Sequence, residues 1–131
     1  MAKAIHTMIR VLDTEQSTHF YEKAFGLKPV HVLDYPDFKL TYLRNDENDF
    51  EIELTENKGR QEPYDLGNAY GHLAVCVEQL EEEHSRMKSA GLVIGDLKTM
   101  KYNDEVTARF FFVTDPDGYK IEVLEKKGHY V

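Results

Sequence analysis

The sequence predicts an α+β fold built from two tandem copies of one β-α-β-β-β unit. In segments 6–11 and 72–77, polar and apolar residues alternate as they do in a half-buried strand. Each segment is followed by a helical pattern that ends at a glycine, and then by three strand-like runs. Such a repeated order is typical of an internal duplication. Matching residues keep a steady offset: 66 residues from His6 to His72, 65 from Gly26 to Gly91 and 69 from Glu53 to Glu122.

In the first half, the helical pattern covers residues 14–25. Asp13 and Gln16 are placed to cap its N-terminus, and Gly26 ends it, because glycine readily adopts the left-handed conformation that follows a helix. The three strand-like runs are 29–33, 38–43 and 50–54. Residues 58–63 are polar and turn-rich, and they predict the connection between the halves.

In the second half, residues 79–90 predict a helix without a good N-terminal cap, and Gly91 ends it. The strand-like runs are 92–94, 106–113 and 119–124. The last two runs are joined by Asp-Pro-Asp-Gly at 115–118. This sequence is typical of a tight turn, because proline fixes φ and glycine tolerates positive φ.

The composition predicts one folded domain, with repeat halves of about 1–62 and 63–131. Of 131 residues, 41% are hydrophobic and 31% charged, which excludes disorder as a description of the whole. No apolar run approaches the roughly 20 residues of a membrane-spanning helix, and we expect no secretory signal at residues 1–6. A net charge of -8 disfavours nucleic acid and anionic membranes as partners. The single cysteine, Cys76, fits a reducing compartment, so we expect a cytoplasmic protein.

Two histidines and two glutamates occupy matching positions of the repeat, and in each half they lie on the polar face of the predicted strands. Because side chains alternate between the two faces of a strand, His6, Glu53, His72 and Glu122 point away from the apolar residues of their strands. The apolar face must pack on the helix, which leaves these four on the uncovered face. A sheet face that is exposed to solvent carries polar residues in any case. For any one of the four residues alone, exposure to solvent is the preferred explanation. It does not explain why the same pair occurs twice.

Two imidazoles and two carboxylates form a mixed nitrogen and oxygen ligand set for a divalent ion. Nickel, cobalt, zinc, manganese and iron would all suit such a set, with positions left for water or substrate. The lack of a thiolate ligand disfavours a closed structural zinc site. The pattern therefore predicts a metal site that is open to a substrate.

Four motifs in this order resemble glyoxalase I, a family of the vicinal oxygen chelate superfamily: HTMIRV at 6–11, IELTEN at 52–57, AYGHLA at 69–74 and DPDGYKIE at 115–122. The resemblance extends from His6 to about residue 125 and implies paired β-α-β-β-β modules. It implies that His6, Glu53, His72 and Glu122 are the metal ligands. It also implies a homodimer in which His6 and Glu53 of one chain meet His72 and Glu122 of the other. The short loops are similar to the compact bacterial type, for which one nickel or cobalt ion per site is favoured and zinc is possible.

The family isomerises the hemithioacetal of methylglyoxal and glutathione to S-lactoylglutathione through an enediolate. The resemblance therefore implies a lyase of methylglyoxal detoxification that needs no cofactor beyond the metal. It implies that a carboxylate beside the metal moves the proton. Glu122 matches the family's base, and Glu53 is its counterpart in the other half.

Three residues match positions at which the family binds glutathione. Arg10 shares a face with His6 and lies about 13 Å from it at roughly 3.3 Å per residue; Asn57 and Lys101 match further positions. The sequence departs from the family at Lys58, where a tryptophan is frequent. It also departs at 98–105, which lack the glycines of a Lys-Gly-Gly loop.

Two other function classes stay open at the level of sequence. One is a superfamily protein that binds metal or a small molecule without isomerase activity. The other is an oxygenase, which typically uses two histidines and one carboxylate. Sequestering relatives usually lack the full ligand set, and the second glutamate argues against an oxygenase. The complete set of four therefore favours the isomerase.

Overall fold

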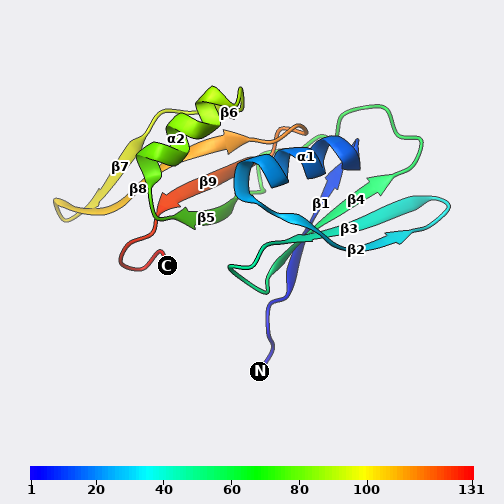
Figure 1. The fold of residues 1–131 in the computed structure, drawn as a ribbon, viewed down its shortest axis with the longest axis horizontal. Helices are drawn as coiled ribbons and strands as arrows, with labels where there is room; N and C mark the ends of the chain where they lie inside the picture. Colours follow the sequence, from blue (N-terminus) through cyan, green and yellow to red (C-terminus); the bar gives the residue numbers. More distant parts are fainter. The chain divides into compact units, whose positions relative to one another are not determined.

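The computed structural model describes all residues from 1 to 131 and divides into two compact units, Met1–Asp65 (unit 1) and Leu66–Val131 (unit 2). Each unit contains one helix and one mixed sheet (Figure 1). The predicted α+β class with a duplicated module is therefore confirmed. The division falls close to the predicted boundary between the halves. That the two halves make a single domain stays a prediction.

Unit 1 has a four-stranded sheet in the order β1-β4-β3-β2. Strands β1 and β4 are parallel, and the other neighbours are antiparallel. Its elements are β1 His6–Val11, α1 Thr14–Phe25, β2 Lys28–Asp34, β3 Phe38–Arg44 and β4 Glu51–Asn57. All five were predicted from the sequence, and their ends differ from the predicted ones by at most three residues.

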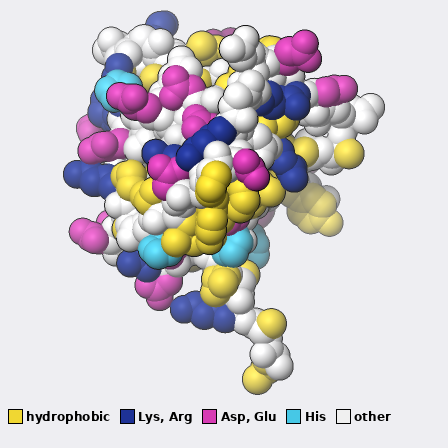
Figure 2. Space-filling view, turned by 90° about the vertical axis from the view of Figure 1, so that its right-hand side faces the viewer, with side chains coloured by type: hydrophobic (Ala, Val, Ile, Leu, Met, Phe, Trp, Pro, Cys, Tyr) yellow, Lys and Arg dark blue, Asp and Glu magenta, His cyan; other side chains and the backbone are white.

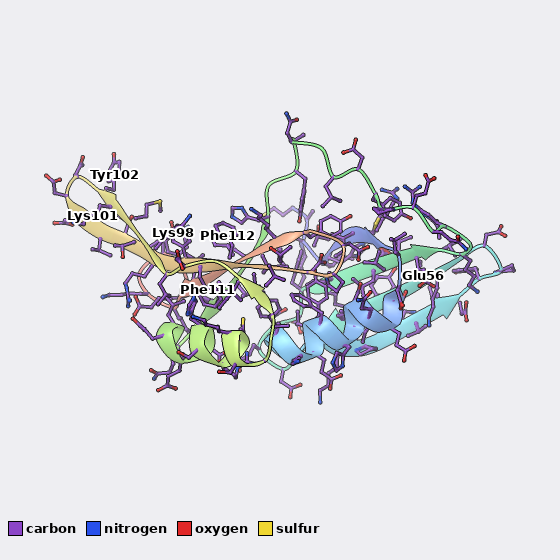
Figure 3. The ribbon with its side chains drawn as sticks, turned by 90° about the horizontal axis from the view of Figure 1, so that it is seen from above. Glu56, Lys98, Lys101, Tyr102, Phe111 and Phe112 are labelled. Carbon is purple, nitrogen blue, oxygen red and sulfur yellow. The ribbon has the colours of Figure 1, made fainter.

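Helix α1 begins where two carboxylates meet its free amides. Asp13 accepts a hydrogen bond from the backbone N–H of Gln16 at 3.1 Å. Glu56 of β4, labelled in Figure 3, accepts one from the backbone N–H of Thr14 at 2.9 Å. Negative charge at this end also suits the helix dipole. Gly26 then ends the helix with a φ of 66°, as predicted.

The core of unit 1 lies between α1 and one face of the sheet. Alternate residues of the strands point to this face, so the opposite face has no helix of its own unit upon it. The buried hydrophobic side chains are Ile9, Val11, Phe20, Tyr21, Ala24, Leu27, Leu43, Ile52 and Leu54. The predicted division into an apolar and a polar face is thus confirmed for β1 and β4, whereas β2 has no buried residue.

Unit 2 repeats this plan with one additional strand. Its sheet has the order β5-β9-β8-β6, with β5 parallel to β9, and β7 pairs with β8. The elements are β5 Leu73–Val77, α2 Leu80–Ser89, β6 Val93–Ile94, β7 Lys98–Tyr102, β8 Glu105–Thr114 and β9 Lys120–Glu125. As predicted, α2 has no side-chain cap at its N-terminus. Neither helix of the chain has the length and apolar character needed to cross a membrane.

Strand β7 was not predicted from the sequence. It forms a hairpin with β8, and Asn103 and Asp104 at the turn both have positive φ, 49° and 63°. Two such residues in succession form the turn that matches the twist of a two-stranded hairpin. All residues of β7 are exposed, so burial imposes no alternation on its sequence. The polar pair at 103–104 was the available signal. Lys101 therefore lies in a strand and not in a loop like the family's Lys-Gly-Gly loop.

The carboxylate cap of α1 predicts a measurable loss of stability. Asp13→Ala removes the acceptor for the Gln16 amide, and we expect the free energy of unfolding to fall by about 1 kcal/mol. Urea unfolding followed by circular dichroism measures this. Asp46→Ala, at an exposed turn residue, is the matched control. Equal stabilities of the two variants would contradict a capping role for Asp13.

Candidate metal and active site

The first histidine–glutamate pair lies on the uncovered face of the unit 1 sheet. Strands β1 and β4 are neighbours, with Met8 opposite Glu53. His6, two residues before Met8, points to the same face. The Nε2 atom of His6 and the Oε2 atom of Glu53 are 3.7 Å apart. The Glu53 side chain is only 12% exposed, whereas that of His6 is 37% exposed. The imidazole therefore reaches solvent beside a carboxylate that is mostly shielded from it.

Tyr42 of β3 binds the other oxygen of Glu53. It lies opposite Glu53 in the β3–β4 register, and its hydroxyl donates a hydrogen bond to Oε1 at 2.5 Å. This hydrogen bond raises the pKa of Tyr42 from 10.0 to about 12, because ionisation would place a second negative charge beside the carboxylate. The ring centroid of Tyr42 is 5.7 Å from those of both His6 and His31. One oxygen of Glu53 is thus fixed by Tyr42 while the other faces His6.

The second pair has the same layout in unit 2. His72 comes directly before β5, and its Nε2 atom is 2.9 Å from Oε2 of Glu122 on β9. The two side chains are 40% and 17% exposed. Phe112 of β8, labelled in Figure 3, lies opposite Glu122 in register, and its ring centroid is 5.1 Å from that of His72. Phe112 therefore occupies the place that Tyr42 has in unit 1, without a hydroxyl.

The spacing of each pair can be compared with that of two ligands on one divalent ion. Ligand atoms about 2.1 Å from an ion lie roughly 3.0 Å apart at a right angle and about 3.4 Å apart at a tetrahedral angle. The 2.9 Å distance in unit 2 fits this spacing. The 3.7 Å distance between His6 and Glu53 is about 0.3 Å wider than the tetrahedral value, so these two side chains would move slightly closer to share an ion. Within the chain, no three His, Cys, Asp or Glu side chains gather into a group that could hold a metal ion.

Two of the three predicted substrate residues lie on the same face as the first pair. Arg10 of β1 is opposite Thr55, and Asn57 lies two residues further along β4. Both are exposed, and the Asn57 side-chain amide donates to the hydroxyl of Tyr64 at 3.0 Å. Lys101 belongs to unit 2, where it is exposed on the β7–β8 hairpin (Figure 3).

A hydrophobic side chain shares this face of unit 1 with the polar groups. Met8, between His6 and Arg10 on β1, is 39% exposed and points to the same side of the sheet as they do. On the side of the molecule seen in Figure 2, hydrophobic side chains gather with histidines at their border. A few polar groups set in apolar surface are typical of small-molecule sites.

Tyr42 and Phe112 were not predicted from the sequence as site residues. Tyr42 lies 11 residues before Glu53, and Phe112 lies 10 residues before Glu122. An aromatic residue in the strand before each glutamate was therefore the available signal. Its meaning becomes clear only from the register, which places each ring directly opposite the carboxylate.

Comparison with known proteins gives one consistent result. Residues 3–123 match the family model of the Glyoxalase/Bleomycin resistance protein/Dioxygenase superfamily. The lactoylglutathione lyase of Neisseria meningitidis is 44% identical over 130 residues, which cover 95% of this chain and 91% of that protein. The chain belongs to the glyoxalase I family. The lactoylglutathione lyase of Salmonella typhimurium is 37% identical, over 95% of this chain and 93% of its own.

Among solved structures, the glyoxalase I of Leishmania major has a TM-score of 0.78 and 32% identity, covering 96% of this chain and 88% of its own. The family recognised in the sequence, its fold and the enzyme class of lactoylglutathione lyase are therefore confirmed. Members of the glyoxalase I family depend on a divalent metal ion.

The hydrogen bond between Tyr42 and Glu53 predicts an alkaline titration that can be observed directly. Because the pKa of Tyr42 is raised, its bond stabilises the fold fully below pH 10, and this contribution is lost as the pH rises through about 12. In chelator-treated protein, we expect the tyrosinate absorbance of wild type minus that of Tyr42→Phe to rise near pH 12. A difference curve centred near pH 10 would contradict the bond. Both proteins unfolded in urea provide the reference curves.

Proposed function

We propose that the chain isomerises the hemithioacetal of methylglyoxal and glutathione to S-lactoylglutathione. The observation that carries this proposal is that a histidine and a glutamate lie side by side at matching positions of both units, 3.7 and 2.9 Å apart, in a chain of the glyoxalase I family. The two bacterial relatives are lactoylglutathione lyases, which supports this choice of substrate. Removal of methylglyoxal would be the biological role.

The metal ligands in this proposal are His6, Glu53, His72 and Glu122. Each pair is two ligands short of the full set, so we propose a homodimer in which a pair from each chain binds one ion. The ligands are nitrogen and oxygen atoms only, which suits nickel or cobalt, our preferred ions, and also zinc. Tyr42 supports the arrangement, because a hydrogen bond to the second oxygen of a carboxylate is a common way to orient a ligand.

In the proposed reaction, a bound divalent ion supplies Lewis-acid stabilisation of the negative charge that develops on the two substrate oxygens. Glu122 removes the proton from the carbon that bears sulfur, which gives an enediolate, and returns it to the neighbouring carbon. The carbon–sulfur bond is kept and the first carbon becomes the thioester carbonyl, so no external oxidant is needed. Glu122 suits this role because its side chain is partly exposed and its hydrogen bond within unit 2 is to His72 alone.

Arg10, Asn57 and Lys101 are the proposed contacts to the thiol part of the substrate. A guanidinium can bind a glutathione carboxylate through two parallel hydrogen bonds, and Arg10 lies on the face of the first pair. The glyoxalase I of Leishmania major is trypanothione-dependent, so the trypanothione hemithioacetal is the second substrate to test. A cytoplasmic location fits the proposal, because glutathione and an unpaired cysteine, Cys76, both belong to reducing compartments.

Metal removal and restoration test the proposed activity. We expect chelation to abolish S-lactoylglutathione formation, and nickel or cobalt to restore more of it than zinc. In the restored enzyme, Glu122→Gln should lower kcat by at least about 100-fold, because general base catalysis is typically worth that much or more. Glu82→Gln, on the exposed face of α2, is the matched control. A protein that binds the metal but leaves both hemithioacetals unchanged would instead be a binding protein of the superfamily.

Mixing two inactive variants tests whether the site is shared between chains. His6→Ala and His72→Ala should each be inactive alone, since every site then lacks one ligand. In a mixed dimer with shared sites, one site lacks both histidines and the other is intact, so random pairing should restore about a quarter of the wild-type activity. Sites formed within single chains would stay inactive after mixing. The mixture is prepared by unfolding and refolding the two variants together, with wild type treated in the same way as the reference.

A further inference from the structure

The two histidine–glutamate pairs have equivalent surroundings, and we call the strands and the aromatic residue around each pair its frame. In each unit the glutamate faces an aromatic residue on the neighbouring antiparallel strand, Tyr42 for Glu53 and Phe112 for Glu122. Each aromatic ring also lies nearly perpendicular to the histidine ring of its pair, at 80° in unit 1 and 82° in unit 2. The aromatic ring therefore meets the histidine ring at nearly the same angle in both halves of the repeat, with centroids 5.7 and 5.1 Å apart.

The two frames differ in the hydroxyl of Tyr42. This hydroxyl donates to Oε1 of Glu53 at 2.5 Å, whereas Phe112 offers no donor to Glu122. The Glu53 side chain is also the less exposed of the two, at 12% against 17%. Glu53 is thus fixed through one oxygen, while the hydrogen bond of Glu122 within unit 2 is to the histidine of its own pair.

We infer that Tyr42 is a positioning residue that makes Glu53 the fixed ligand and, because Phe112 lacks the same hydroxyl, leaves Glu122 as the carboxylate that moves. This inference rests on the proposed function. To act as a base, a carboxylate must rotate from its ligand position towards the substrate carbon. Rotation of Glu53 would break its bond to Tyr42, and a buried carboxylate that loses a charge-assisted hydrogen bond is penalised. Glu122 has no bond of this kind to break at Phe112.

The first arm of the test measures metal binding and needs no activity. Tyr42→Phe keeps the ring against His6 and removes only the hydroxyl. We expect its affinity for Co²⁺, measured by calorimetry on chelator-treated protein, to fall about 10–100-fold, as is typical when a group that orients a ligand is lost. The visible spectrum of the Co²⁺ protein should change with it. Tyr130→Phe, at the half-buried tyrosine of the C-terminal bridge, is the control that should leave both unchanged.

The second arm adds the missing hydroxyl to unit 2. Phe112→Tyr places it opposite Glu122, as Tyr42 places its own opposite Glu53, and Phe112 is only half buried. We expect kcat to fall at least about 10-fold while Co²⁺ affinity is kept or rises, because the carboxylate becomes a better ligand and a poorer base. Phe110→Tyr is the matched control, since Phe110 is also half buried on β8 but faces Leu124.

The results separate the positioning role from the proposed function. Wild-type Co²⁺ affinity in Tyr42→Phe, or wild-type kcat in Phe112→Tyr, would overturn the inference. Weakened Co²⁺ binding in Tyr42→Phe would support the positioning role even if the wild-type protein converts neither hemithioacetal, in which case the proposed function alone would fail. Circular dichroism and urea unfolding show whether each variant folds. If Phe112→Tyr does not fold, the Co²⁺ affinity of Tyr42→Phe decides between the outcomes.

Discussion

A strand with a helix on one face only must send alternate side chains into opposite environments, and the geometry of the site depends on this constraint. Burial of Val11, Ile52 or Leu54 contributes about 1.5–3 kcal/mol each. A slip of one residue in β1 or β4 would expose several such side chains at once. The loss would be comparable to the whole stability of a small protein, about 5–15 kcal/mol. His6 and Glu53 are therefore held on the open face by core residues on the opposite face of the same strands.

The same constraint acts a second time in unit 2, where Ile121 and Val123 are buried and Glu122 lies between them on the opposite face. In both units, the strands that carry the pair are parallel neighbours, β1 with β4 and β5 with β9. Ligands on paired strands are positioned more precisely than ligands on loops, because hydrogen bonds fix the backbone on both sides. Duplication of one module thus yields two equivalent histidine–glutamate pairs on well-fixed backbones.

The extent to which sequence predicts this molecule follows from what a pattern of burial can encode. Alternation in residues 6–11 gives the face of His6, and Asp13 and Gly26 give the ends of α1, because each signal is local. Strand β7 leaves no such signal, since both of its faces are exposed. Tyr42 was missed for a different reason: alternation assigns a residue to a face but not to a partner on the next strand. That partner depends on the β3–β4 register, which is set by the connection at residues 45–50.

Duplication also creates a chemical difficulty, because equivalent modules supply equivalent carboxylates, whereas proton transfer needs unequal ones. Two carboxylates in one site acquire different roles only when their surroundings differ. If both were fixed by hydroxyls, neither would be free to take a proton; if neither were fixed, the ion would lose a firm oxygen ligand whenever one moved. In this chain the surroundings of Glu53 and Glu122 match in strand register and in the angle between the aromatic and histidine rings. The hydroxyl of Tyr42, absent at Phe112, therefore makes the two carboxylates unequal at the atom that contacts the carboxylate, while the strand register that the two modules share is kept.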